Sequence, residues 1–516
     1  MHFFLAREFL EAPAQGRPDK VALVCNGRRF RYGELDLMAN RLANALLEAG
    51  VQRGDRVVIF LDNGLEAVVS IFAALKASAV FVVVNRSTKA DKLNYILNNC
   101  QATALVTDSR SPFKPSSGDA GVLLPSLKTL VLCGESREGE TADGISIRFF
   151  DEIQRETSAA RPASRNIDLD LACLIYTSGS TGEPKGVMSD HSNVVFASGS
   201  IIQYLGSTDS DIVINVLPLS FDYGLYQLLM TFQCGGTLVL EKSFTYPATV
   251  LELMVKERVT GLPGVPTLFA LLVKMDLSAY DLSSLRYLTN TAAALPPSHI
   301  LELRQKFPQA RLFSMYGLTE TKRTLFLPPE QLDGRPDSVG IPIPGTEAWV
   351  ADDSGQRLAP GSIGELVVRG RHVMRGYWAA PEATAQRFRP GPLPGERICY
   401  TGDLFRQDEE GFFYFVGRKD DIIKSRGEKV APKEVENVLY ELPGVKAAAV
   451  VGVPHPTLGQ AVKAILVTTP PGQVTTARVL AHCRSRLEDF MVPHQVEFRD
   501  SLPVNASGKI SKKDLA

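Results

Sequence analysis

The chain has 516 residues, of which 45% are apolar and 22% are charged, and its 56 basic and 57 acidic side chains give a formal net charge of −1. At roughly 100–200 residues per domain, this length predicts about three to four domain-sized units with a large buried core. The composition excludes a disordered or fibrous chain. The near-neutral charge excludes a bulk electrostatic footprint for nucleic acid or an anionic membrane, although not a local patch.

The cysteines and the N-terminal segment indicate a cytoplasmic protein. The seven cysteines are scattered singly, without the spacing of a metal site, which predicts reduced thiols in the core. Residues 1–8 lack a basic segment followed by a long apolar run, so we expect no signal peptide. The most apolar stretch, 67–84, contains Lys76 and small residues, and it predicts a buried helix and a strand rather than a membrane span.

Strands and helices alternate over the first 150 residues. The spacing of apolar residues predicts helices at 32–49 and 65–77 and strands at 21–24, 57–61, 80–84 and 104–107. This alternation, which resumes at Leu171 and continues to about residue 330, predicts parallel sheet with crossover helices.

The pattern changes twice in the remainder of the chain. Short strands separated by Gly/Pro turns between 339 and 415 predict an antiparallel or barrel-like unit. After Gly417, a charged segment, a helix opened by Pro432, two apolar strands and a helix at 475–487 predict a small α+β domain. The predicted fold class is therefore α/β. A large N-terminal domain, residues 1–416, contains doubly wound sheets and a β-barrel-like unit, and residues 417–516 form the small domain.

One segment has the composition of a phosphate-binding loop. The string Tyr-Thr-Ser-Gly-Ser-Thr-Gly-Glu-Pro-Lys-Gly-Val, residues 176–187, follows an apolar strand. Its small and hydroxylated residues provide backbone N–H groups and hydroxyl donors for a polyphosphate, and Lys185 adds a cation. The predicted nucleotide-binding residues here are Thr177, Ser178, Gly179, Ser180, Thr181 and Gly182. The string lacks the spacing of a Walker A loop.

An ordered set of motifs resembles the adenylate-forming superfamily of acyl-CoA synthetases, amino-acid adenylation domains and firefly-type luciferases. The loop at 176–187 is followed, in the order of the family, by MYGLTE at 315–320, VGIP at 339–342, GEL at 364–366, YTGDL at 400–404, GRKDDIIK at 417–424 and NASGKI at 505–510. The resemblance covers essentially the whole chain.

The resemblance implies a nucleotide site whose roles agree with the chemistry of the residues. Tyr316 would stack on adenine, and Thr319 would offer its hydroxyl to phosphate. Glu320 offers a hard oxygen ligand to Mg²⁺. Asp403 can accept both ribose hydroxyls, and Arg418 can donate to ribose or phosphate.

The resemblance also implies a two-step reaction with a mobile C-terminal domain. A carboxylate attacks the α-phosphate of Mg-ATP to give an acyl-adenylate, and a second nucleophile displaces AMP. Lys509 would stabilise the charge that develops in the first step, together with Lys185, Thr319 and Glu320. The small domain would then rotate about a hinge at Asp420 and present the strand that carries Lys424 and Gly427. His191 fits a family position, with a structural role as the alternative.

Departures from the family pattern fall in the expected acyl pocket. Many acyl-CoA synthetases have a histidine in a Leu-Pro-x-x-His motif. In this chain the corresponding residue is Phe221, which is followed by Asp222. Asp222 could hold the ammonium of an amino acid, bond a hydroxyl or be a buried capping residue. Lys322 and Arg323 could meet a second polar group of the substrate or point to solvent. Residues 292–294 are alanines where glycines are usual, which could narrow the acyl pocket or the thiol channel.

The pocket candidates are Asp222, Tyr223, Gly224, Tyr226, Met315 and Arg323, which favour a medium, ring-sized or polar acid over a long fatty chain. We expect an ATP- and Mg²⁺-dependent acid–thiol ligase whose acceptor is coenzyme A or the phosphopantetheine of a separate carrier protein. The alternatives are an amide ligase with a small amine as acceptor and a stand-alone amino-acid–carrier-protein ligase. A non-catalytic relative is disfavoured by Lys185, Glu320, Asp403 and Lys509. We expect neither a nucleic-acid partner nor a membrane span.

Overall fold

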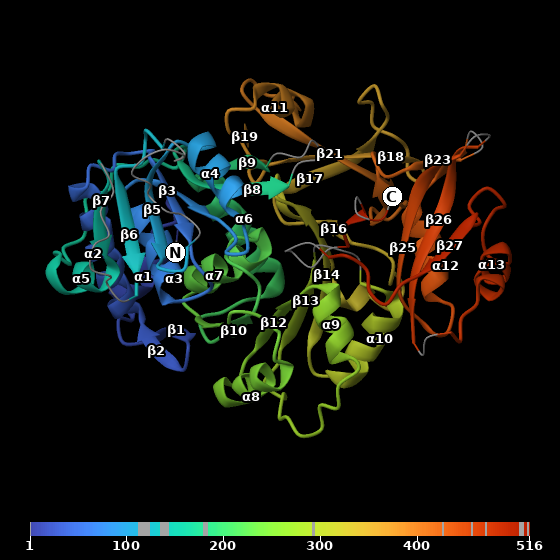
Figure 1. Cartoon of the computed structure of the whole chain (residues 1–516), viewed down its shortest axis with the longest axis horizontal. Coiled ribbons are helices and arrows are strands. Elements are labelled where there is room, and N and C mark those ends of the chain that lie inside the picture. Colours follow the sequence, from blue (N-terminus) through green and yellow to red (C-terminus); the bar gives the residue numbers. More distant parts are fainter. Residues whose placement is uncertain are drawn as a thin grey trace.

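The computed structural model describes residues 2–111, 124–134, 144–178, 184–291, 295–425, 428–455, 458–469, 472–504, 510–512 and 515. Within these ranges the strands form four sheets (Figure 1). Figure 1 shows the C-terminal strands and helices at one end of the molecule, away from α1, α2 and α5.

The largest sheet contains nine described strands and carries one half of the nucleotide motifs. Its order is β16 (Ile341–Pro342), β15 (Lys322–Leu327), β14 (Arg311–Leu318), β13 (Tyr287–Asn290), β12 (Gly261–Gly264), β10 (Ile212–Asn215), β11 (Thr237–Leu240), β1 (Val21–Cys25) and β2 (Arg28–Arg31). The strands from β14 to β1 pair in parallel, and the strands at both edges are antiparallel. A parallel sheet requires crossover helices, which matches the alternation in the sequence.

The second sheet, of eight described strands, carries the phosphate-loop motif. Its order is β19 (Gly376–Tyr377), β9 (Pro184–Asp190), β8 (Leu171–Ser178), β4 (Val80–Val83), β3 (Arg56–Phe60), β5 (Ala102–Asp108), β6 (Thr129–Cys133) and β7 (Ser146–Phe149). β8 and β9 form an antiparallel pair, and β19 joins the outer edge of β9. A two-residue strand from late in the chain is thereby placed beside the phosphate loop.

The helices of the large domain are amphipathic or wholly buried. They are α1 (Glu8–Gly16), α2 (Tyr32–Glu48), α3 (Leu65–Lys76), α4 (Ala90–Asn99), α5 (Phe150–Glu156), α6 (His191–Leu205), α7 (Asp222–Cys234), α8 (Pro247–Glu257), α9 (Pro266–Leu272), α10 (Pro297–Lys306), the 3₁₀ helix η1 (Pro329–Gln331) and α11 (Pro381–Arg387). The main core lies between the two sheets, where Phe72 of α3 stacks on Phe232 of α7 at 5.4 Å between ring centroids.

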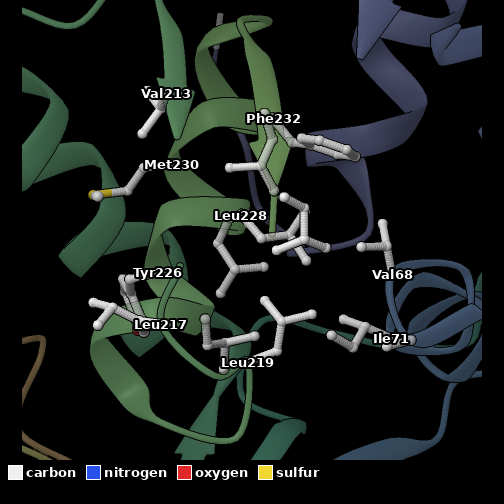
Figure 2. Close-up of a cluster of buried hydrophobic side chains, with 14 of the residues drawn as sticks. Val68, Ile71, Val213, Leu217, Leu219, Tyr226, Leu228, Met230 and Phe232 are labelled. Carbon is white, nitrogen blue, oxygen red and sulfur yellow. The ribbon is translucent and has the colours of Figure 1, made fainter. Parts of the chain in front are cut away.

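The central helix α7 belongs to this core and also carries candidate residues of the acyl pocket, among them Tyr223 and Tyr226. Figure 2 shows Tyr226 and Met230 on the side of α7 away from Val68 and Ile71 of α3. All of the residues from Asp222 to Phe232 are buried. The helix is therefore enclosed on all sides although it carries polar residues such as Asp222 and Gln227, and this packing fixes the orientation of the pocket candidates at its start.

The third sheet is antiparallel and joins the large domain to the hinge segment. β17 (Thr346–Ala351), β18 (Ile363–Gly370), β21 (Arg397–Gln407) and β20 (Phe388–Pro390) follow one another, and β22 (Phe413–Arg418) pairs with β21. The fourth sheet belongs to the small domain and contains β24 (Glu428–Val430), β23 (Ile423–Ser425), β26 (Gly459–Thr468), β25 (Val445–His455) and β27 (Gln495–Phe498). The helices α12 (Pro432–Tyr440) and α13 (Thr476–Arg484) contribute to its core.

The structure confirms the predicted α/β class with a large N-terminal and a small C-terminal domain. The division between residues 416 and 417 stays a prediction, and β22 continues past it to Arg418. The stretch 67–84 contains most of α3 and the strand β4, as predicted. In the described part of the chain, no helix is both long and apolar enough to cross a membrane.

Candidate active site

Tyr377 links the predicted phosphate-binding lysine to the predicted magnesium ligand. Its hydroxyl donates a hydrogen bond of 2.5 Å to Oε1 of Glu320, which is buried just beyond the end of β14. The ring of the same tyrosine faces Nζ of Lys185 on β9 at 5.7 Å from its centroid. β19 makes this contact possible, because Tyr377 pairs with Val187 in the sheet. The two large sheets therefore meet at a cation, an aromatic ring and a carboxylate.

Arg387 is a further cation close to Glu320 and Tyr377. Its Nη1 donates to the carbonyl of Tyr400 at 3.1 Å. Burial lowers the pKa of Arg387, but the neighbouring Glu320 and Tyr377 raise it by more, so the guanidinium stays charged. Burial and the charge of Glu320 together raise the pKa of Tyr377, which keeps its hydroxyl protonated as a donor.

A second group, on β14, β21 and β22, brings together the residues predicted to hold the nucleoside. The hydroxyl of Tyr316 donates to Oδ2 of Asp403 at 2.6 Å, and Nε of Arg418 lies 3.7 Å from Oδ1. The Tyr316 ring packs edge-on against Phe405 at 4.8 Å. Asp403 and Arg418 are direct partners in the β21–β22 ladder. Burial, followed by the charge of Asp403, raises the pKa of Tyr316 well above its usual value.

The phosphate loop is described only at its two ends. Thr177 on β8 pairs with Lys185 on β9, so the strands hold the start of the loop next to the lysine. Ser178 ends β8. The other predicted loop residues, Gly179, Ser180, Thr181 and Gly182, lie outside the described residues.

The C-terminal candidates are described in part. Asp420 is exposed between the end of β22 and the start of β23. Lys424 lies on β23 with its side chain outside the described part. Gly427 and Lys509 lie outside the described residues, as do the alanines at 292–294.

The acyl-pocket candidates form a buried ionic cluster. Nζ of Lys322 lies 2.9 Å from Oδ1 of Asp222, and Nη1 of Arg323 lies 3.5 Å from Oδ2. The residues Lys322 and Arg323 are only 1% and 2% exposed. The alternative in which these cations point to solvent is therefore wrong. The carboxylate of Asp222 faces two cations of the protein. In the hypothesis of an amino-acid substrate, this carboxylate would instead have to pair with the ammonium group of the substrate.

The rings of Tyr223 and Tyr226 of α7 lie against the two cations of this cluster. The hydroxyl of Tyr223 is bonded to Thr289, at 2.7 Å from its carbonyl oxygen and 2.6 Å from Oγ1. The hydroxyl of Tyr226 is buried without a hydrogen-bond partner in the described part of the structure. The Sδ atom of Met315 accepts a hydrogen bond of 2.8 Å from Tyr204 of α6.

Gly224 allows close packing of α7 against the loop that precedes it. A Cβ atom at this position would lie 2.3 Å from the carbonyl oxygen of Pro218 and 2.8 Å from that of Leu217. The carbonyl of Gly224 also accepts from Nδ2 of Asn215 at 3.1 Å. Its absence of a side chain lets the start of α7, and with it Asp222, approach the preceding loop.

His191 has the structural role that the sequence left open. It begins α6, is fully buried, and its Nδ1 accepts a hydrogen bond of 3.1 Å from the backbone N–H of Ala6. Burial lowers the pKa of His191 to about 4, so the ring is a neutral acceptor.

The donor set fits ATP with Mg²⁺ as a substrate. No group of three or more His, Cys, Asp or Glu residues suited to a resident metal occurs in the described ranges. Glu320 is instead a single carboxylate, and Mg²⁺ is typically bound by one or two carboxylates together with substrate phosphates. Lys185 supplies the matching cation from β9 of the other large sheet.

Sequence reasoning missed Tyr377, Arg387 and Tyr204. The segment that contains Tyr377 has no spacing that links it to Glu320, and only the pairing of β19 with β9 brings them together. Arg387 ends a short helix whose sequence is that of an ordinary surface element. Tyr204 lies among the apolar residues of α6.

The fold and the two residue groups are those expected of a nucleotide-dependent enzyme with a large and a small domain. Residues 10–378 match the family of AMP-binding enzymes, and residues 434–509 match the C-terminal domain of AMP-binding enzymes. The chain is 35% identical to a feruloyl-CoA synthase of an Amycolatopsis species, over 97% of this chain and 96% of that protein. It is 32% identical to a long-chain-fatty-acid–CoA ligase of Bacillus subtilis, over 96% and 91% of the two chains.

A solved structure shows the same architecture. The o-succinylbenzoate coenzyme A synthetase of Bacillus subtilis, in complex with ATP and magnesium ion, superposes with a TM-score of 0.82 at 29% identity and covers 97% of this chain and 98% of its own. The chain belongs to the AMP-binding enzyme family, which confirms the resemblance seen in its motifs. It is an AMP-forming acid–thiol ligase that works through an acyl-adenylate.

Proposed function

We propose that this enzyme activates a medium-sized carboxylic acid with ATP and transfers the acyl group to coenzyme A. The observation that carries the proposal is the contact of Tyr377 with both Glu320 and Lys185, because it assembles a magnesium ligand and a phosphate-binding cation at one point. The named relatives act on acids as different as feruloyl and long-chain fatty acyl groups, so identity alone does not select the acid.

One group of residues would bind the nucleoside of ATP, and the other would bind its phosphates. Asp403 offers oxygen acceptors to the ribose, and Tyr316 and Arg418 hold that carboxylate in place. Lys185, the phosphate loop and Thr319 would bind the triphosphate, and Glu320 would provide a ligand for Mg²⁺. No side chain attacks the substrate, so the rate enhancement comes from positioning and from stabilising the charge on the α-phosphate.

The C-terminal domain, with its predicted boundary at 416/417, completes the site in two orientations. In the first step Lys509 would reach the carboxylate and the α-phosphate. Rotation about Asp420 would then replace it with the strand of Lys424 and Gly427, beside which the thiol enters. The exposed position of Asp420 between β22 and β23 supports a hinge there. A cytoplasmic location, like a carrier protein as acceptor, stays a prediction.

The test separates the two steps. ATP–pyrophosphate exchange measures adenylation, and mass spectrometry detects the product when coenzyme A, a phosphopantetheinyl carrier protein or an amine is added. We expect acid-dependent exchange and a coenzyme A thioester. Product with an amine alone, or with the carrier alone, would contradict the proposed acceptor.

Two lysine variants sharpen the assignment of the first step. Lys509→Ala should lower the exchange rate by about 100- to 1,000-fold, as expected for loss of a transition-state donor. Lys512→Ala, in the same terminal segment, is the matched control, because Nζ of Lys512 pairs with Glu436 at 2.7 Å instead. Equal rates in the two variants would remove Lys509 from the mechanism.

A further inference from the structure

The ionic cluster beside α7 carries an unbalanced positive charge. Lys322 and Arg323 face Asp222, so two cations share one carboxylate in a region where all three residues are less than 10% exposed. Buried charges are costly unless they are paired and hydrogen-bonded. One of the two cations is therefore short of a counter-charge.

Lys322 is the better satisfied of the two. Besides Asp222 at 2.9 Å, its Nζ donates to the carbonyl of Thr319 at 3.1 Å. Its backbone has φ of +57°, and this left-handed turn directs the lysine back toward the Thr319–Glu320 segment. Lys322 thus has a counter-charge at ion-pair distance and one hydrogen-bond acceptor without a ligand, whereas Oδ1 of Asp222 makes no hydrogen bond within the described residues.

Arg323 is poorly satisfied. Its only described polar contacts are Nη1 to Asp222 and Nη2 to the carbonyl of Tyr223, both at 3.5 Å, and its Nε has no hydrogen-bond partner in the described residues. The rings of Tyr223 and Tyr226 lie 4.5 and 5.6 Å from its Cζ and stabilise the cation without using its N–H donors. Buried donors normally have partners, so this arrangement points to an absent acceptor.

The hydroxyls of Tyr226 and Tyr204 also lack a strong hydrogen-bond acceptor within the described residues. Tyr226 has a buried hydroxyl without a partner in the described structure. Within the described residues, the hydroxyl of Tyr204 donates to the thioether of Met315, which is a weak acceptor. A guanidinium with spare N–H groups among tyrosine hydroxyls is suited to a carboxylate, which accepts several hydrogen bonds and supplies the missing negative charge.

We infer that Arg323 binds a second carboxylate at the far end of the acid, so that the substrate class is short dicarboxylic acids. This inference rests on the proposed function, because it assigns the acyl pocket of the same site. The strand register places Arg323, the proposed anchor of the second carboxylate, close to the nucleotide motif. Arg323 pairs with Gly317 across β14 and β15, next to Tyr316 and close to Thr319. Because the anchor lies so near the nucleotide motif, the chain between the two carboxylates is short.

The first test uses the unmodified enzyme. ATP–pyrophosphate exchange is measured with linear diacids of about three to six carbons and with benzene dicarboxylic acids, each beside its monomethyl ester. The ester keeps the shape and removes one charge. Because a hydrogen bond to a charged group contributes about 1.5–3 kcal/mol, we expect the best diacid to exceed its ester by roughly 10- to 100-fold in kcat/KM.

The outcomes separate this inference from the proposed function. An ester, a neutral acid or an α-amino acid that equals or exceeds the best diacid would overturn the inference and leave acid activation intact. Absence of exchange with every acid would contradict the proposed function, and the inference with it.

Variants locate the effect on Arg323. Arg323→Met removes the charge and keeps the length, and it should abolish the preference for the diacid mainly through KM, while Arg323→Lys should restore part of it. Arg311→Met is the matched control: this arginine begins β14 and lies 5.1 Å from the Phe313 ring. A preference that survives Arg323→Met in a folded protein would also overturn the inference.

Discussion

Tyr377 donates a hydrogen bond of 2.5 Å to Oε1 of Glu320, although 57 residues separate them in the chain. The bond fixes one oxygen of the carboxylate and thereby restricts the orientation of the Glu320 side chain. Tyr377 is therefore a positioning residue for a predicted magnesium ligand.

Tyr377→Phe should remove the hydrogen bond that orients Glu320 without disturbing the packing of the ring. The ring would keep its edge contact with Phe388, which is at 5.6 Å. Loss of a hydrogen bond to a charged group should reduce kcat/KM for ATP by about 10- to 100-fold. The Mg²⁺ concentration needed for half-maximal exchange should rise as well, which a purely structural defect would not cause.

Tyr414→Phe is the control for this variant, because Tyr414 donates to a carboxylate, that of Asp408, at 3.0 Å outside the predicted site. An unchanged Mg²⁺ dependence in Tyr377→Phe, or an equal change in both variants, would contradict the positioning role.

Asp403→Asn tests the nucleoside group. The change removes the charge that holds Arg418 and weakens the acceptor of the Tyr316 hydrogen bond. We expect KM for ATP to rise by about 10- to 100-fold, with a smaller rise in KM for the acid. Asp352→Asn, in the turn after β17, is the control because its carboxylate accepts backbone N–H groups of that turn. A rise confined to the acid would assign Asp403 to another substrate.

Much of the fold follows from patterns that the sequence displays locally. The helical spacing in 32–49 predicts α2, which is buried on the face that the pattern defines. The apolar segments at 65–77, 80–84 and 104–107 predict α3, β4 and β5, which are buried on nearly all sides. The motif residues Tyr316 and Asp403 likewise meet as the resemblance implied.

The contacts that could not be predicted depend on pairing between distant segments. Tyr377 reaches Glu320 only because a two-residue strand joins the edge of β9. For Lys322 and Arg323, two adjacent cations after an acidic residue are equally typical of a solvated turn. Their burial depends on Asp222, which α7 carries into the same interior.

Lys76→Met should destabilise the large domain. Nζ of Lys76 lies 3.0 Å from Glu11 and 2.7 Å from Asp36, and the lysine side chain has no exposed surface. Removing one partner of a buried ionic cluster leaves uncompensated carboxylates and typically costs about 3–5 kcal/mol. The contact of Arg161 with Asp36 at 3.1 Å should offset part of this loss.

The measurement for Lys76→Met is the free energy of the first urea-induced transition. Lys128→Met is the control, since this lysine is exposed and bonds only the carbonyl of Gly50 within the described residues. It should change the free energy by no more than about 0.5 kcal/mol. A stabilised Lys76→Met protein would show that the cluster costs more to bury than it contributes.

His191 should make the stability of the enzyme sensitive to mildly acidic pH. Burial lowers the pKa of His191 from its ordinary 6.5 to about 4. Above pH 6.5 the ring is neutral in both the folded and the unfolded chain. As the pH falls below 6.5, the unfolded chain binds a proton that the folded chain does not, so stability decreases until about pH 4. At pH 5 this loss is about 2 kcal/mol.

His191→Gln removes the titrating group and retains an acceptor for the backbone N–H of Ala6. The difference in unfolding free energy between pH 7.5 and pH 5 should therefore be about 2 kcal/mol smaller in this variant than in the parent enzyme. His372, whose pKa burial lowers to about 3, contributes a loss of the same sign, but it is present in both proteins and cancels in the comparison. Equal pH dependence of the two proteins would show that His191 is protonated or accessible in the folded state.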